Sequence, residues 1–134
     1  MTTDSAHVGQ RIDRPATDVY TYVADPANLP EWAPGLATAV DQVDGEWFVT
    51  FGDARAKVRF APANVYGVLD HEVTLPTGET FLNPVRVVPY GEGCEIVFSV
   101  RRLPGVSDDD FARDAAQVTS DLARLRNLLE NQKP

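Results

Sequence analysis

The chain has few of the residues that cross-link a protein or ligate metal ions. It contains one cysteine, Cys94, and two histidines among 134 residues. A disulfide within the chain is therefore excluded, and the histidines and the cysteine lack the spacing of a zinc site. A glycine loop that could hold a phosphate between a strand and a helix is also missing. We therefore expect neither a metal nor a cofactor.

Long apolar runs are absent as well. No segment approaches the roughly 18 apolar residues that a membrane-spanning helix requires. The first residues, MTTDSAHVGQR, lack the basic and then apolar pattern of a secretory signal. Together with the missing disulfide, these features favour a cytoplasmic protein without membrane insertion.

Positive charge is scarce. Twelve lysines and arginines against 20 aspartates and glutamates give a formal net charge of -8. Such a surface repels phosphate backbones and anionic lipid head groups, so nucleic acid and membrane partners are not expected. The length suits one domain, residues 1–134, with its own hydrophobic core.

Turn signals divide the middle of the chain into strands. Asp44-Gly45 and Gly52-Asp53 place glycine as two-residue hairpin turns require. Further loops are predicted at residues 62–63, 76–78 and 90–93, each marked by proline or glycine. The pattern predicts a meander of antiparallel strands.

These turns determine which residues oppose one another across the predicted sheet. The predicted pairs are Val40 with Val49, Val49 with Ala56, Trp47 with Val58, Phe60 with Val65, His71 with Asn83, Val87 with Ile96, and Val85 with Phe98. Directly opposed residues point to the same side of a sheet. The pairs therefore define one inner, mainly apolar face, while Arg55, Lys57 and Arg59 belong to a solvated outer face.

Helices are expected on both sides of this meander. A strand over residues 7–13 precedes a short helix over residues 15–23 and a helical turn over residues 27–32. The C-terminal helix is predicted from Ser107 as its N-cap, followed by three aspartates that suit the helix dipole. Its apolar stripe has steps of four and three: Phe111, Ala115, Val118, Leu122, Leu125 and Leu129. An apolar stripe of this length requires burial, and we expect it to pack against the inner face of the sheet.

The order of these elements and several sequence segments resemble the START-like (SRPBCC) helix-grip superfamily, in particular its bacterial polyketide cyclase/dehydrase-like branch. The segments are IDRPATDVY (12–20), DPANLPEW (25–32), RVVP (86–89) with GEG (91–93), and DLARL (121–125). The resemblance covers essentially the whole chain. It implies an α+β helix-grip fold, in which a curved antiparallel sheet of six to seven strands wraps the long C-terminal helix, with two short helices after the first strand.

The resemblance also implies a cavity between sheet and helix for a lipid-, sterol- or polyketide-like molecule. Positions assigned to this cavity are Trp32, Trp47, Phe51, Val58, Leu69, Phe81, Val85, Phe98, Phe111, Ala115, Val118 and Leu122. The same residues could instead fill a packed core, because periodicity does not distinguish a cavity from a core. Trp32 could gate or stack on a ligand, or pack against the sheet.

Two polar residues are predicted on the inner face, opposite each other. His71 could transfer a proton near neutral pH, and Asn83 could orient the ring or hold a substrate carbonyl. Alternatively, His71 is a core histidine whose ring is hydrogen-bonded to its neighbours. Asp70 and Glu72 point to the opposite face by alternation. Asp114 borders the apolar stripe, where a solvated flank is favoured over a position at one end of the cavity.

The sequence thus favours binding of a hydrophobic small molecule by a monomer or homodimer. One alternative is a cofactor-free polyketide cyclase, dehydratase or aromatase that uses His71 as acid and base. A second is an interaction protein with a vestigial cavity and an outer sheet face, carrying Phe48 and Tyr66, that docks a partner.

Overall fold

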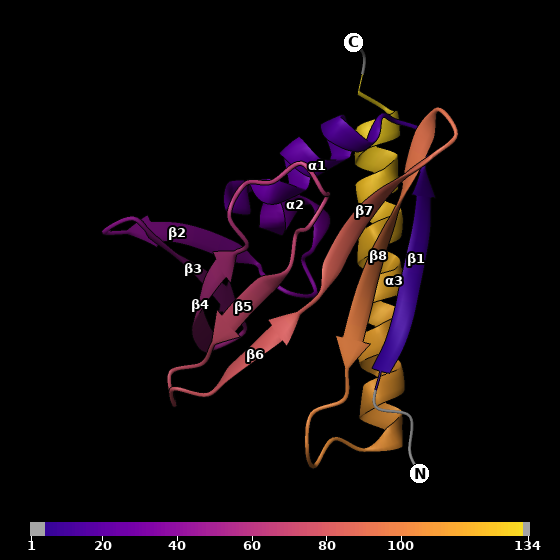
Figure 1. The fold of residues 1–134 in the computed structure, drawn as a ribbon. Helices are drawn as coiled ribbons and strands as arrows, with labels where there is room; N and C mark the ends of the chain where they lie inside the picture. Colours follow the sequence, from indigo (N-terminus) through magenta and orange to yellow (C-terminus); the bar gives the residue numbers. More distant parts are fainter. Residues whose placement is uncertain (1–4, 133–134) are drawn as a thin grey trace.

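A computed structural model describes residues 5–132. Its elements in chain order are β1 (Ser5–Ile12), α1 (Ala16–Ala24), the 3-10 turn η1 (Pro26–Asn28), α2 (Leu29–Trp32), β2 (Ala39–Val43), β3 (Glu46–Phe51), β4 (Ala54–Phe60), β5 (His71–Thr74), β6 (Thr80–Asn83), β7 (Val85–Tyr90), β8 (Gly93–Arg101) and α3 (Asp108–Glu130). This arrangement confirms the predicted α+β class, with short helices after the first strand and a long C-terminal helix (Figure 1).

The strands form two antiparallel sheets, of order β1-β8-β7 and β2-β3-β4-β5-β6, rather than one sheet of six to seven strands. The difference arises at Pro84, between β6 and β7. Proline has no N–H to donate to a ladder. Before Pro84 the chain pairs with β5, and after it the chain pairs with β8. The two sheets are therefore halves of one bent surface joined through the β6–β7 segment.

Most of the predicted register is confirmed. Val40 pairs with Val49, Val49 with Ala56, and Trp47 with Val58. His71 pairs with Asn83, and β7 and β8 have the predicted pairs Val87 with Ile96 and Val85 with Phe98. The turn chemistry at Asp44-Gly45 follows the prediction, with both residues at positive φ, 52° and 82°. The turn positions therefore correctly predicted which residues of these strands share the inner face of the sheet.

The predicted loop at residues 62–63 is wrong. Phe60 pairs with His71 instead of facing Val65, and Val65 is 92% exposed. Residues 61–70 form a long connection that runs back beside β7, where Leu69 N donates to Val85 O and Val87 N donates to Gly67 O. The shift between Val65 and His71 is an even number of residues, so the inner face is preserved.

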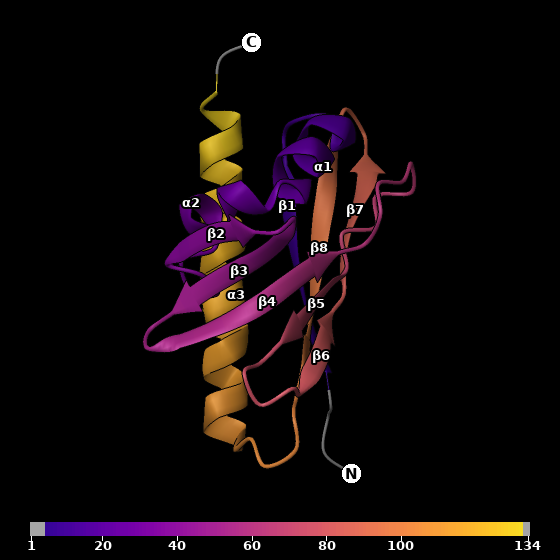
Figure 2. The same cartoon turned by 90° about the vertical axis from the view of Figure 1, so that its left-hand side faces the viewer.

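Helix α3 begins as the sequence predicts. Ser107 Oγ accepts a hydrogen bond from Asp110 N at 3.1 Å, and three aspartates occupy the first turn. The helix packs along β1 and β8 and against α2 (Figure 1). Strands β2 to β4 cross α3 obliquely in Figure 2 but stand away from it in Figure 1, because the cavity described below separates them.

The core is continuous from α1 and α2 to α3. Its largest fully buried side chains include Trp32, Leu29, Ile96, Leu122 and Leu125. Burial of each such apolar side chain contributes about 1.5–3 kcal/mol. None of the helices in residues 5–132 is both long and apolar enough to cross a membrane.

Candidate functional site

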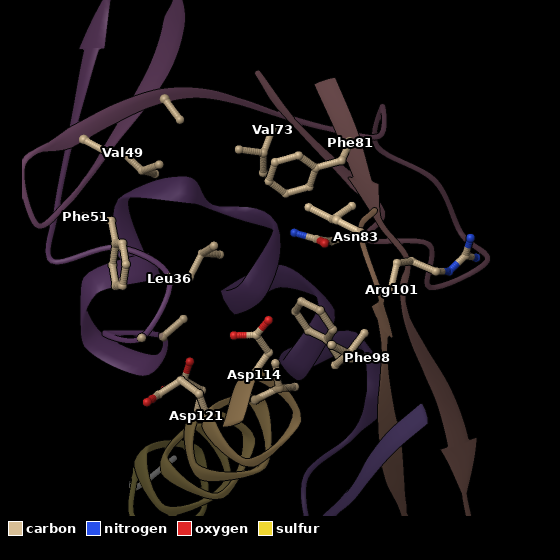
Figure 3. A pocket seen from close by; sticks show the side chains of 18 of the residues that line it. Leu36, Val49, Phe51, Val73, Phe81, Asn83, Phe98, Arg101, Asp114 and Asp121 are labelled. Atoms are coloured by element: carbon tan, nitrogen blue, oxygen red, sulfur yellow. The ribbon is translucent and has the colours of Figure 1, made fainter. Parts of the chain in front are cut away.

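A cavity of about 380 Å³ lies between α3 and the five-stranded sheet (Figure 3). Apolar side chains from six elements form most of its wall: Trp32 of α2, Val49 of β3, Val73 of β5, Phe81 of β6, Phe98 of β8 and Leu122 of α3. Its volume falls within the range of about 300–1,000 Å³ that is usual for small-molecule sites. The arrangement can enclose an apolar molecule.

The space exists because small residues occupy inward positions of β4. Ala54 and Ala56 line the cavity from that strand, and Ala56 lies opposite Val49 of β3. Protein interiors normally interdigitate large and small side chains to a density that leaves few voids. Ala56 faces the medium-sized Val49, and Ala54 faces Phe51, whose ring is 53% exposed, so this part of the sheet leaves space in front of α3.

The rim of the cavity is partly exposed and apolar. Two apolar residues of the lining are exposed: Phe51 at the end of β3 and Leu103 in the loop after β8. Their exposed fractions are 53% and 40%. Figure 3 shows the Phe51 ring beside the interior and the guanidinium of Arg101 directed away from it. The solvent-exposed edge of the cavity is therefore apolar at these two positions.

Asp121 is a buried carboxylate in the cavity wall. It is 6% exposed, and Gln117 Nε2 donates a hydrogen bond to its Oδ1 at 3.0 Å. Desolvation raises the pKa of Asp121, against the smaller opposing effects of hydrogen bonds from Gln117 and the Gly35 backbone. Figure 3 shows Asp114 and Asp121 projecting from α3 toward the interior. An acidic group thus lies at the edge of an apolar space.

Trp32 contributes an unpaired donor. The side chain is 1% exposed and lines the cavity. Its buried Nε1–H has no hydrogen-bond acceptor within residues 5–132. Leaving such a donor unpaired costs about 1–3 kcal/mol. A hydrogen-bond acceptor placed next to the indole N–H would therefore lower the free energy of this site.

His71 lies behind the wall rather than in it. Its ring is 1% exposed, stacks on Phe60 at 4.8 Å between centroids, and meets Phe98 edge-on at 5.9 Å. Nδ1 donates to Leu69 O at 3.3 Å, and Nε2 accepts from Asn83 Nδ2 at 3.3 Å. Burial lowers the pKa of His71 to about 4, so the ring is neutral at pH 7. Asn83, in contrast, lines the cavity.

Seven of the residues proposed from the sequence meet around the cavity: Trp32, Phe51, Phe81, Asn83, Phe98, Val118 and Leu122. The others lie outside its lining: Trp47, Val58, Leu69, His71, Val85, Phe111 and Ala115. Trp47 and Val58 share the inner face, but they border a separate polar hollow with Lys57 and Glu72. Phe111 lies in the first turn of α3 beneath the Arg102 guanidinium, 5.8 Å from the ring centroid.

Asp121, Gln117 and the small residues of the wall were missed. A signal for the carboxylates was present, because Asp114, Val118 and Asp121 follow the same steps of four and three as the apolar stripe. Asp114 is exposed, as expected for a solvated flank, and it also lines the cavity, the other interpretation that the sequence left open. Asp70, expected on the solvated outer face, is paired with Arg86 and accepts a hydrogen bond from Val85 N at 2.9 Å.

The profile of the family described as polyketide cyclase / dehydrase and lipid transport matches residues 4–130. Among curated proteins no sequence matches. Solved structures share the fold: XoxI from Bacillus cereus has a TM-score of 0.75 at 14% identity, covering 96% of this chain and 97% of that one.

The Aha1 dimer from Colwellia psychrerythraea has a TM-score of 0.76 at 10% identity, with coverage of 98% and 100%. DynU16, a protein of the dynemicin biosynthetic locus, has a TM-score of 0.74 at 18% identity. The comparison with DynU16 covers 99% of this chain but only 49% of that protein.

Proposed function

Because the chain belongs to the polyketide cyclase / dehydrase and lipid transport family, we propose that it binds an apolar small molecule in the cavity between α3 and the five-stranded sheet. The observation that carries this proposal is the cavity itself, about 380 Å³ with a mainly apolar wall. A liquid water occupies about 30 Å³ and needs polar partners, so water is a poor occupant of the apolar part of this space. The free energy gained by burying an apolar ligand is the natural compensation for the missing packing contacts.

The surroundings of His71 favour a supporting role over acid–base catalysis. Both ring nitrogens are used in hydrogen bonds, to Leu69 O and from Asn83 Nδ2. A general base needs a free lone pair within reach of the substrate and a pKa near the working pH. With a pKa of about 4 and no position in the cavity lining, His71 instead orients Asn83, whose amide faces the ligand.

The proposal can be tested by closing the cavity. Val118 lines it from α3, and Val118→Trp should fill it with an indole ring. We expect the neutral apolar dye N-phenyl-1-naphthylamine to bind the wild-type protein and to bind Val118→Trp at least about tenfold more weakly. Fluorescence titration measures both affinities.

A matched control places the same bulk outside the cavity. Val65 is 92% exposed, so Val65→Trp should leave dye affinity within about twofold of the wild type. Circular dichroism and thermal unfolding of each variant show whether it is folded. Equal dye affinity of folded Val118→Trp and wild type would contradict binding in this cavity.

A separate experiment tests whether an apolar compound copurifies with the protein from the cells that produce it. Native mass spectrometry of freshly purified protein should give a mass larger than that of the polypeptide alone. Denaturation should then release an apolar compound whose mass equals this difference. Val118→Trp purified in parallel should lack that compound. Equal retention by both proteins would place the compound outside the cavity.

A further inference from the structure

One end of the cavity is polar, where α2 and the loop after it meet α3. Gln117 bridges these segments, since it bonds to Asp121 and lies so close to Gly35 that a Cβ at residue 35 would collide with it. Arg124 Nε, on the next turn of α3, donates to Glu31 O at 2.6 Å and secures the same junction. Trp32 and Asp121 therefore line the cavity from neighbouring, firmly connected segments.

These two residues have opposite hydrogen-bonding capacities. The indole Nε1–H of Trp32 can only donate, and an ionised carboxylate such as Asp121 can only accept. Trp32 Nε1 is buried without an acceptor in the described part of the chain, and Asp121, which accepts from Gln117 Nε2 and the Gly35 backbone, has further lone pairs on its two oxygens. A ligand that completes both groups must offer an acceptor to one and a donor to the other.

We propose, resting on the function proposed above, that the ligand carries a hydroxyl group on an apolar body and presents it to Trp32 and Asp121. A hydroxyl oxygen accepts hydrogen bonds and its O–H donates one, so an alcohol or a phenol matches both residues. A protonated amine can only donate and would leave the Trp32 indole unpaired. The chemical class is thus a neutral hydroxylated apolar molecule.

The charges of the wall exclude acidic ligands. A ligand carboxylate near Asp121 would place two negative groups in a space shielded from water, where repulsion is strong. Asp114 adds a second carboxylate to the wall. Among the described wall residues Arg101 is the basic one, and its guanidinium is directed away from the interior (Figure 3). Fatty acids and other apolar acids should therefore bind poorly compared with the corresponding alcohols.

Three probes with one ring system test this inference at pH 7: naphthalene, 2-naphthol and 2-naphthoate. Isothermal titration calorimetry should give the highest affinity for 2-naphthol, with 2-naphthoate at least about tenfold weaker. In ¹H–¹⁵N spectra, 2-naphthol should shift the indole N–H signal of Trp32 and leave that of Trp47, which lies outside the cavity lining, in place. Naphthalene should shift the Trp32 signal less, because it has no acceptor oxygen.

A pair of charge variants isolates Asp121. Asp121→Asn keeps a polar group but removes the charge, and should raise 2-naphthoate affinity about tenfold while weakening that for 2-naphthol, whose O–H loses its charged acceptor. Asp109→Asn removes the same charge from an exposed position of α3 and should change neither affinity by more than about twofold.

Equal wild-type affinities for 2-naphthol and 2-naphthoate would overturn the inference, and so would a Trp32 signal that 2-naphthol leaves unmoved. Both results would leave the proposed binding of apolar molecules intact. Failure of all three probes to bind, naphthalene included, would contradict the proposed function itself and the inference with it.

Discussion

Asn83 Nδ2 donates a hydrogen bond to His71 Nε2 at 3.3 Å, so a residue of the cavity wall is anchored to a residue of the core. The other ring nitrogen of His71 is held by Leu69 O. With Phe60 stacked on its face, the ring has one orientation available. His71 therefore connects the long loop, β5 and β6, and it fixes the orientation of the Asn83 amide in the cavity wall.

The first prediction concerns stability. His71→Ala removes two hydrogen bonds and a buried ring, and should lower the free energy of unfolding by about 2–4 kcal/mol. Urea unfolding monitored by fluorescence measures the change. His7 is exposed, and His7→Ala should cost less than about 1 kcal/mol. Equal losses in the two variants would show that His71 is not a structural residue.

The second prediction concerns acid sensitivity. Burial lowers the pKa of folded His71 to about 4, below its unfolded value of about 6.5. Between these values the unfolded chain binds a proton that the folded protein does not, so stability falls as pH decreases. The contribution amounts to about 3 kcal/mol across this window.

His71→Gln should flatten the pH dependence of unfolding between about pH 6.5 and 4, relative to the wild type. Urea unfolding at half-unit pH intervals gives both curves. The difference between them is informative because contributions from the acidic residues cancel. Parallel curves would indicate that His71 titrates in the folded protein as it does in the unfolded chain.

The third prediction has the opposite sign. Desolvation raises the pKa of Asp121, so its ionised form destabilises the folded protein, and stability is gained as pH falls through the folded pKa. Asp121→Asn should remove that cost and stabilise the protein at pH 7 by about 1 kcal/mol. The gain should disappear below the unfolded pKa of about 3.9, where both side chains are neutral.

Thermal unfolding at pH 7 and pH 3.5 measures this effect. Asp109 stands in the first turn of α3, where negative charge is favourable, so Asp109→Asn should be neutral or slightly destabilising at pH 7. A loss of stability in Asp121→Asn would mean that its carboxylate is more stabilised by Gln117 and Gly35 than desolvation costs.

The register of most strands could be predicted from the sequence because glycine-containing turns and the two-residue alternation are local. The connection of residues 61–70 could not. Its shape depends on Asn64, whose Oδ1 accepts from Tyr66 N and Val68 N and whose backbone N donates to the distant Tyr20 hydroxyl. Such a contact across 44 residues leaves no trace in the local sequence pattern.

The family resemblance implied a cavity, and the strand pattern indicated which face it lies on but not its extent. Alternation tells which face a strand residue occupies, and it does not tell how far along the strand α3 reaches. Alternation therefore predicts that both Trp47 and Phe51 line the cavity, although of the two only Phe51 does. Burial of Asp121 follows from the approach of Gly35 and Gln117, a tertiary contact that charge patterning treats as solvated surface.

The fourth prediction concerns the attachment of the long loop to β7. Arg86 Nε and Nη2 donate to the two carboxylate oxygens of Asp70 at 2.9 and 2.8 Å, and Val85 N donates to Oδ1 at 2.9 Å. The hydrogen bonds from Arg86 lower the pKa of Asp70, so this contribution to stability is present above about pH 3.9 and is lost as pH falls further.

Asp70→Asn replaces one acceptor oxygen with a donor that faces the guanidinium, and should cost about 1.5–3 kcal/mol at pH 7. Asp41→Asn is the matched control, because the Arg55–Asp41 pair has the same distance of 2.8 Å but its carboxylate side chain is 52% exposed, whereas that of Asp70 is 16% exposed. That exposed pair should contribute less than about 1 kcal/mol. Hydrogen exchange adds a local measurement, since the amides of Leu69 and Val87, which join the loop to β7, should exchange faster in Asp70→Asn only. If both variants lose equal stability and these two amides stay protected, the loop is held to β7 by its backbone hydrogen bonds rather than by Asp70.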